Sequence, residues 1–176
     1  MKLFGRRTTL DLPSFDNGLP RDFAAVLAAA GVPRFRDALP RMEMEFERAR
    51  RYGRSIAVAL AGPEQNGGHA DTGSSASPDH VRPNESAPQS GPLFAALLGS
   101  LIRELMRETD IVAYAAVLDR CTVVMPEIGG AEARLAARRI RDVCTNRLAV
   151  PIRTEIAVFP HDGLTLEELL KLADAR

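Results

Sequence analysis

The residues in this sequence that are best suited to chemistry are its arginines and aspartates. Of the 23 basic residues, 21 are arginine, and a guanidinium group can form two parallel hydrogen bonds with one partner. The pattern Arg-x-x-Asp occurs at Arg34–Asp37, Arg107–Asp110 and Arg139–Asp142. Composition alone predicts about one occurrence, and an i,i+3 ion pair at a helix end explains the pattern without any ligand. Its position in the fold must therefore decide whether it has a function.

The most informative position is that of Arg107–Asp110, between a predicted helix and a predicted hairpin. Residues 93–107 have apolar side chains at helical spacing. The stretch that follows is rich in Val, Ala and Tyr, and Cys121–Met125 is a second apolar run. Val117–Arg120 lies between them and has the length of a hairpin turn. We expect an antiparallel hairpin at 111–126, with any chemistry where the helix end meets the hairpin tip.

The rest of the chain predicts helices and strands in alternation. Further helices are expected at 22–30, 34–52, 131–146 and from Thr165 to the end, and further strands at 55–61 and 150–159. We expect Pro40 to begin the main part of the second helix, and Thr165 with Glu168 to form a capping box. Strands separated by helices, with a hairpin among them, predict an α+β fold. Its central sheet would be of the ferredoxin or nucleotide-cyclase type, with flanking helices.

Residues 62–92 interrupt this alternation. Of these 31 residues, 15 are Gly, Pro or Ser, and very few are apolar. Such a segment cannot bury enough surface to offset the entropy of ordering it, so the composition predicts a long disordered insertion. We expect residues 1–33 to form an N-terminal lead-in with a short helix, and residues 34–176 to form one domain around the insertion.

Composition also limits the partners and the location. The formal net charge is zero, so no overall field attracts nucleic acid. No apolar run approaches the roughly 20 residues of a membrane span, and the N-terminus lacks the apolar stretch of a signal peptide. Cys121 and Cys144 have no short metal-type spacing, and we expect both to be reduced core residues of a cytoplasmic protein. No cofactor is expected.

Three segments together resemble a known family, the GGDEF domain of diguanylate cyclases, enzymes that join two GTP molecules into cyclic di-GMP. Glu47–Val58 is similar to the family's leading helix and first strand. Arg107–Ala113 and Val123–Glu127 are similar to the segments that flank the signature hairpin, and Phe159–Asp174 resembles the terminal turn and helix. The resemblance extends from about residue 34 to the end, outside the insertion.

The sequence departs from this family where the family's catalysis takes place. The signature Gly-Gly-Asp/Glu-Glu-Phe is replaced by Ala115–Cys121, so the glycines that allow close backbone approach are absent. The carboxylates that hold divalent metal are also replaced, and the first strand ends in Leu-Ala-Gly at 60–62 instead of a metal-binding Asp. Asp119 remains, but a turn Asp is its commoner role. The resemblance therefore implies a domain with no metal site and no cyclase activity.

One binding site of the family, unlike its catalytic residues, has its characteristic residues at the matching position of this sequence. Many members have Arg-x-x-Asp just before the signature hairpin as an inhibitory site for cyclic di-GMP, and Arg107 and Asp110 match that position. The family adds an arginine from the next helix, which corresponds to Arg139. Arginine can bond guanine O6 and N7, and a carboxylate can accept from guanine N1 and N2. The resemblance implies an inactive domain that acts as a cyclic di-GMP receptor through Arg107, Asp110 and Arg139.

Two other interpretations remain open at this stage. Arg107 and Asp110 can form only a structural ion pair, and the domain can be a ligand-free scaffold that engages a partner protein on a GGDEF-like fold. A residual cyclase is the least expected of the possibilities.

Overall fold

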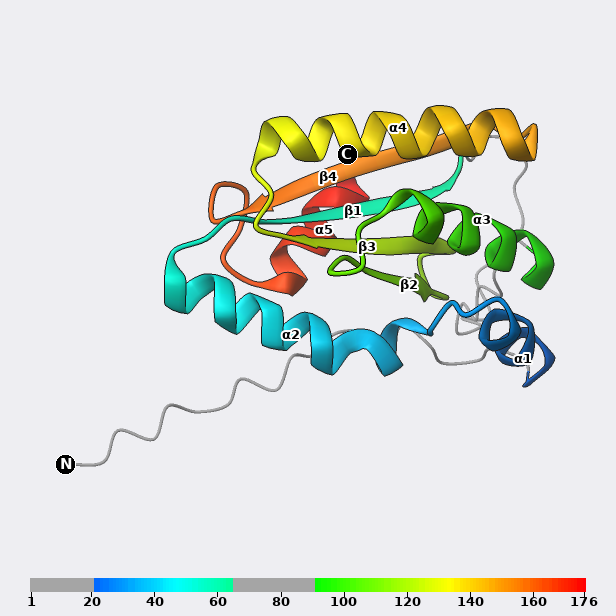
Figure 1. Ribbon diagram of the computed structural model, residues 1–176, viewed down its shortest axis with the longest axis horizontal. Helices are drawn as coiled ribbons and strands as arrows, with labels where there is room; N and C mark the ends of the chain where they lie inside the picture. The colour runs from blue at the N-terminus through cyan, green and yellow to red at the C-terminus, as the bar shows by residue number, and fades with distance from the viewer. Residues whose placement is uncertain (1–20, 65–90) are drawn as a thin grey trace, which may run out of the picture.

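A four-stranded antiparallel sheet forms the centre of the protein (Figure 1). The structure is a computed structural model that describes residues 21–64 and 91–176. The strands are β1 (Ile56–Pro63), β2 (Ile111–Ala115), β3 (Arg120–Pro126) and β4 (Ile152–Phe159), in the order β2-β3-β1-β4. The predicted hairpin is confirmed as β2 and β3, with its turn at 116–119, one residue earlier than expected.

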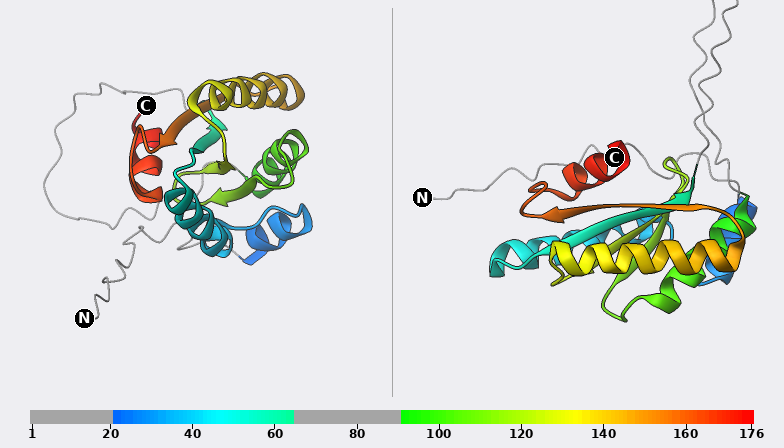
Figure 2. Two further views of the ribbon diagram at one scale, coloured as in Figure 1. Left: turned by 60° about the vertical axis from the view of Figure 1, so that its left-hand side comes forward. Right: turned by 90° about the horizontal axis from the view of Figure 1, so that it is seen from above.

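Five helices cover the two faces of this sheet (Figure 2). They are α1 (Arg21–Ala29), α2 (Phe35–Tyr52), α3 (Pro92–Leu105), α4 (Gly130–Leu148) and α5 (Leu166–Ala175). Buried side chains of α2 and α5 pack on one face, and those of α1, α3 and α4 pack on the other. The α+β, nucleotide-cyclase-like architecture expected from the sequence is therefore confirmed.

The strand β1 explains why both faces need helices. Its residues from Ile56 to Gly62 are all buried, and neighbouring side chains of a strand point to opposite faces. Ile56, Val58 and Leu60 belong to the core with α2 and α5, while the three alanines of the strand belong to the core with α1, α3 and α4. The side chains that β1 presents to α1, α3 and α4 are therefore smaller than those it presents to α2 and α5.

The boundaries of β1 and α3 correct the predicted insertion. β1 continues through Gly62 and Pro63, which pair with Arg153 and Ile152 of β4, and Pro92 is the first residue of α3. The prediction ended the strand too early because a glycine and a proline suggest a turn, whereas pairing with β4 keeps them in the sheet. Residues 65–90, the bulk of the predicted disordered insertion, lie outside the described residues.

The prediction that Pro40 begins the main part of its helix is wrong. α2 begins at Phe35, so Pro40 lies inside the helix. Phe35 and Ala38 are buried against the sheet, and this burial holds the first turn in place although proline removes one backbone hydrogen bond. The helix ends at Tyr52, as predicted, and the next residue, Gly53, caps it with a left-handed φ of 62° that glycine adopts readily.

The capping box of α5 is confirmed with one difference. The Thr165 Oγ1 accepts a hydrogen bond from the Glu168 amide at 3.1 Å. The Glu168 carboxylate accepts from the amide of Leu164 at 2.7 Å, one residue before the cap. Both bonds satisfy amides at the helix start that have no partner within the helix.

The two cysteines lie where the sequence predicts. Cys121 in β3 and Cys144 in α4 are buried free thiols. Burial raises the pKa of both, that of Cys144 to about 11, so neither is a reactive thiolate at neutral pH. In the described part of the chain, no helix is long and apolar enough to cross a membrane.

The helix α1 packs on the domain, a point that the sequence alone leaves open. Phe23 stacks on Tyr114 of β2 with ring centroids 5.4 Å apart, and Leu27 and Val32 are almost fully buried. Ser100 of α3 donates to the Ala30 carbonyl at 3.2 Å. These contacts make α1 part of the core, while the domain boundary at 33/34 stays a prediction.

We expect Phe23→Ala to lower the free energy of unfolding by about 3 kcal/mol, because it removes a buried ring and leaves a cavity. Urea unfolding followed by circular dichroism measures this. The matched control is Leu93→Ala, since Leu93 is 66% exposed, and its effect should stay below about 0.5 kcal/mol. Equal stability of the two variants would show that α1 does not dock in solution.

Candidate functional site

The turn between α3 and β2 contains Arg107 and Asp110. The Asp110 amide donates to the Arg107 carbonyl at 3.0 Å, and the Asp110 Oδ2 accepts from the Arg107 amide at 2.8 Å. The Asp110 carboxylate therefore accepts a hydrogen bond from the backbone of Arg107. The Arg107 guanidinium takes no part in this bond. Such a side-chain-to-backbone bond stabilises the turn that leads from the helix into the strand.

The other two copies of the pattern have different contacts. Arg34 and Asp37 form the simple i,i+3 ion pair, with Nε and Oδ2 2.7 Å apart. Asp142 pairs with its neighbour Arg141 at 3.1 Å instead of with Arg139. The same four-residue pattern thus has different hydrogen bonds and ion pairs at each of its three positions in the fold.

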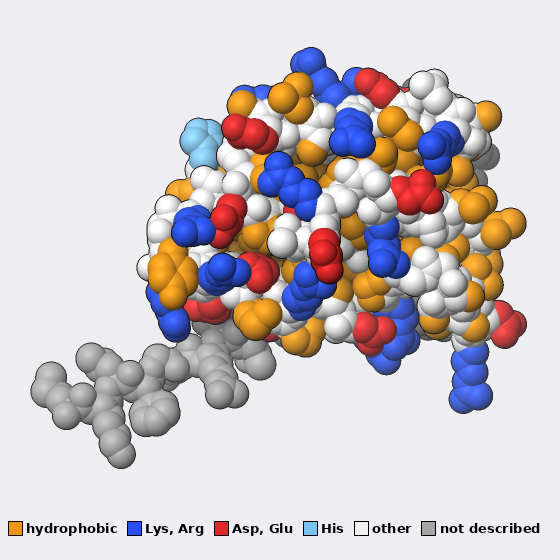
Figure 3. Space-filling view, in the orientation of Figure 1, with side chains coloured by type: hydrophobic (Ala, Val, Ile, Leu, Met, Phe, Trp, Pro, Cys, Tyr) orange, Lys and Arg blue, Asp and Glu red, His pale blue; other side chains and the backbone are white. Residues whose placement is uncertain are grey.

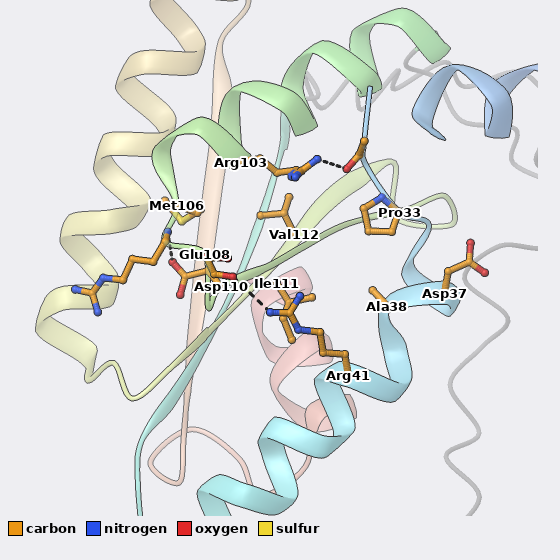
Figure 4. Close-up of a pocket in the computed structure, with 12 residues that line it drawn as sticks. Pro33, Asp37, Ala38, Arg41, Arg103, Met106, Glu108, Asp110, Ile111 and Val112 are labelled. Atoms are coloured by element: carbon orange, nitrogen blue, oxygen red, sulfur yellow. Dashed lines mark hydrogen bonds between the residues drawn. The ribbon is translucent and has the colours of Figure 1, made fainter. Parts of the chain in front are cut away.

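A cleft of about 580 Å³ opens beside the Arg107–Asp110 turn (Figure 4). Its walls come from α2, from the connection between α1 and α2, from the end of α3 and from the start of β2. The charged residues that line it are Asp37, Arg41, Arg103, Arg107, Glu108 and Asp110. Clefts of this size bind small molecules in many proteins.

Asp110 is the most unusual of these residues. Its Oδ2 accepts from the Arg107 amide, but its Oδ1 is buried and accepts no hydrogen bond from the described residues. Burial raises the pKa of the Asp110 carboxyl, while the backbone bond to Arg107 and the nearby positive charge partly oppose this. A buried acceptor without a donor costs about 1–3 kcal/mol, and a ligand that supplies a donor would remove this cost.

Three arginines of the cleft retain donors that a ligand can use. Arg103 donates to the Gly31 carbonyl, and Arg41 donates to the Glu108 carbonyl at 3.4 Å. None of Arg41, Arg103 and Arg107 forms an ion pair with a carboxylate within residues 21–64 and 91–176. Because a guanidinium has five N–H donors, each of them can bind an anion in addition to its present partner.

Arg139, the third predicted binding residue, lies elsewhere. It is an exposed residue of α4 and does not line the cleft beside Arg107 and Asp110. The structure therefore brings together two of the three predicted residues. Arg41 and Arg103 line the cleft but were not predicted, and Arg41 is separated from Arg107 by the whole of β1 and α3, so no local pattern could reveal it.

The hairpin tip is closed by an internal hydrogen bond. Asp119 is buried and has a left-handed φ of 51°, and its Oδ1 accepts from the Tyr114 hydroxyl at 2.5 Å. Burial and this bond raise the pKa of the Tyr114 hydroxyl. Asp119 thus acts as a turn residue with an internal partner.

The acidic and basic side chains of the surface are interspersed. Figure 3 shows both kinds spread over one face without a single large patch of either sign. Among the described residues, no group of three or more His, Cys, Asp or Glu side chains is placed to hold a metal ion.

We expect Asp110→Asn to stabilise the protein at neutral pH. Because the folded-state pKa of Asp110 is raised, the stability that this group contributes falls as the pH rises through its folded pKa. Asparagine keeps an acceptor for the Arg107 amide but buries no charge. Urea unfolding at neutral pH and below the ordinary carboxyl pKa of 3.8 measures the difference. The gain should vanish at the lower pH.

The control for this prediction is Glu108→Gln, which changes an exposed carboxylate in the same turn and should alter the free energy of unfolding at neutral pH by less than about 0.5 kcal/mol. An Asp110→Asn variant that is less stable than the wild type at both pH values would contradict the prediction.

Comparisons with known proteins bear on the fold. No protein-family model matches the chain, and no curated protein shows a significant match. Among solved structures, the chain is similar to the GGDEF domain of YfiN (TpbB) from Pseudomonas aeruginosa. The TM-score is 0.60 and the identity 18%, over 83% of this chain and 88% of that one.

Two further structures give the same result. Diguanylate cyclase SiaD from Pseudomonas aeruginosa, in complex with its activator SiaC, has a TM-score of 0.60 at 20% identity, over 88% of this chain and 60% of that one. A DGC protein from Thermotoga maritima has a TM-score of 0.55 at 17% identity, over 82% of this chain and 94% of that one. The resemblance seen in the sequence is confirmed at the level of fold: the chain has the fold of a GGDEF domain.

Proposed function

We propose that this domain binds cyclic di-GMP in the cleft beside Arg107 and Asp110 and does not synthesise it. The observation that supports this most directly is that the buried Asp110 Oδ1 accepts no hydrogen bond from the described residues, while Asp110 itself lines a cleft that three arginines also line. Guanine N1–H and N2–H₂ are neighbouring donors that suit a carboxylate. One guanine edge on Asp110 would supply the missing hydrogen bond.

Arg107 completes the recognition of the dinucleotide in this proposal. Its guanidinium has no carboxylate partner in the described part of the chain, so it is available to the ligand. A guanidinium can bond guanine O6 and N7 side by side, and it can also bind a phosphate. The cleft volume of about 580 Å³ suits part of a dinucleotide, with the remainder exposed to solvent.

The absence of synthesis is part of the proposal, and it is supported by the residues at the hairpin. Cyclase chemistry needs carboxylates that hold divalent metal near the triphosphate. The hairpin turn at 116–119 contains one carboxylate, Asp119, and its Oδ1 accepts from the Tyr114 hydroxyl. The last three residues of β1 are Ala61, Gly62 and Pro63, none of which has a carboxylate, whereas the resemblance leads us to expect a metal-binding Asp near the end of this strand.

We expect the purified protein to bind cyclic di-GMP with micromolar affinity in isothermal titration calorimetry. Arg107→Ala and Asp110→Ala should each weaken binding at least about tenfold, because each removes a bidentate or charge-assisted contact. Arg138→Ala is the matched control, since Arg138 is an exposed arginine of α4 outside the cleft. The absence of heat at tens of micromolar ligand, or binding that is unaffected by Arg107→Ala, would overturn the proposal.

We also expect no conversion of GTP to cyclic di-GMP with magnesium or manganese. Chromatography of the nucleotides after a long incubation measures this, with an active cyclase as the positive control. If cyclic di-GMP forms, the variant Asp119→Asn tests whether this domain or a contaminating enzyme produced it. Product that disappears in this variant would overturn the proposal of an inactive domain, whereas unchanged product would indicate a contaminating enzyme.

The alternative is a ligand-free protein-interaction domain. α3 exposes two leucines one helical turn apart, Leu93 at 66% and Leu97 at 47%, and SiaD, one of the structural neighbours, is in complex with an activator protein. A pull-down with the double variant Arg107→Ala/Asp110→Ala separates the two functions. A partner that the double variant retains, together with no nucleotide binding by the wild type, would favour the alternative.

A further inference from the structure

The cleft has two walls that come from distant parts of the chain. Arg107 and Asp110 lie on the wall formed by α3 and β2, and Asp37, Ala38 and Arg41 of α2 lie on the other. We infer that Arg41 is the third cation of the binding site and contacts a phosphate of the bound dinucleotide from the wall opposite Arg107. This inference rests on the proposed function and adds a residue from α2 to it.

The position of Arg41 is the first reason. Figure 4 shows its side chain extending from α2 toward Glu108 and Asp110. Its Nη2 donates to the carbonyl of Glu108, a residue between Arg107 and Asp110. A ligand seated on the Arg107–Asp110 turn is therefore within reach of this guanidinium.

The weakness of that contact is the second reason. The distance of 3.4 Å is longer than the usual 2.7–3.2 Å of an N–H···O hydrogen bond. A carbonyl is also a poorer partner for a guanidinium than a phosphate, because a phosphate carries a negative charge and its oxygens can accept two parallel N–H bonds from one guanidinium. A phosphate in the cleft would compete successfully for Arg41.

The charge around Arg41 is the third reason. Two other arginines of α2 pair with carboxylates of the same helix: Arg48 with Glu45 at 3.8 Å and Arg50 with Glu47 at 3.1 Å. Asp37, the nearest acid of the same cleft wall in sequence, already pairs with Arg34. Arg41 forms no ion pair within the described ranges of the chain, so its charge remains available to an anion.

The other two candidate cations have weaker arguments. Arg103 donates to the Gly31 carbonyl, so it holds the connection between α1 and α2 against α3. Arg139 is exposed on α4 and does not line the cleft. Arg41 is the one that faces the Arg107–Asp110 turn from the opposite wall.

Calorimetric titration with cyclic di-GMP tests this role. Arg41→Ala should weaken binding roughly ten- to hundredfold, the loss expected for one hydrogen-bonded charge contact. Arg51→Ala is the matched control, since Arg51 is an exposed arginine of the same helix outside the cleft, and it should change affinity less than about twofold. Arg41→Lys should be intermediate, because it keeps the charge and loses the planar fork.

The outcomes separate this inference from the function on which it rests. No binding by the wild type overturns both. Wild-type binding with equal affinities for Arg41→Ala and Arg51→Ala overturns only the role of Arg41, as does a loss in Arg139→Ala without one in Arg41→Ala. Thermal unfolding without ligand verifies the fold of each variant, and Arg41→Gln replaces Arg41→Ala if the alanine variant does not fold.

Discussion

The burial of β1 on both faces is the constraint on which the other elements depend. Because Ile56, Val58 and Leu60 face one way and the alanines of the strand face the other, each face requires its own layer of helices. β1 also pairs with β3 on one side and with β4 on the other. Because β1 is a central strand with helices on both faces, it determines on which face of the sheet α2 and α3 pack beside the edge strand β2. The cleft exists because these two helices lie on opposite faces and leave space beside that edge.

Much of the fold could be predicted from local sequence, because the relevant signals are local. The hairpin, the capping box at Thr165 and the helix end at Gly53 each follow from residues within a few positions of one another. The errors concern features that depend on distant contacts. Pro63 stays in β1 through its pairing with β4, and α2 begins before Pro40 because its first turn is buried against the sheet.

The residues of the candidate site also divide into those that local sequence predicts and those that only contacts between distant segments bring to the cleft. Arg107 and Asp110 could be found from their order in the chain, since the turn that contains them follows directly from the helix and the strand on either side. Arg41 could not, because α2 reaches the cleft only through packing on the far side of β1 and β2. Arg139 was expected from the resemblance alone, and the position of a residue along a helix does not show whether its side chain reaches a particular cleft.

The Tyr114–Asp119 hydrogen bond has a consequence for how this hairpin can change during evolution. Removal of Tyr114 alone leaves a buried carboxylate without this donor, and removal of Asp119 alone leaves a buried hydroxyl without an acceptor. A protein that has lost only one of the two residues is therefore expected to be less stable than a protein that keeps both or has replaced both. The two positions are therefore coupled, and replacing both residues together is expected to cost less stability than the sum of the two single replacements.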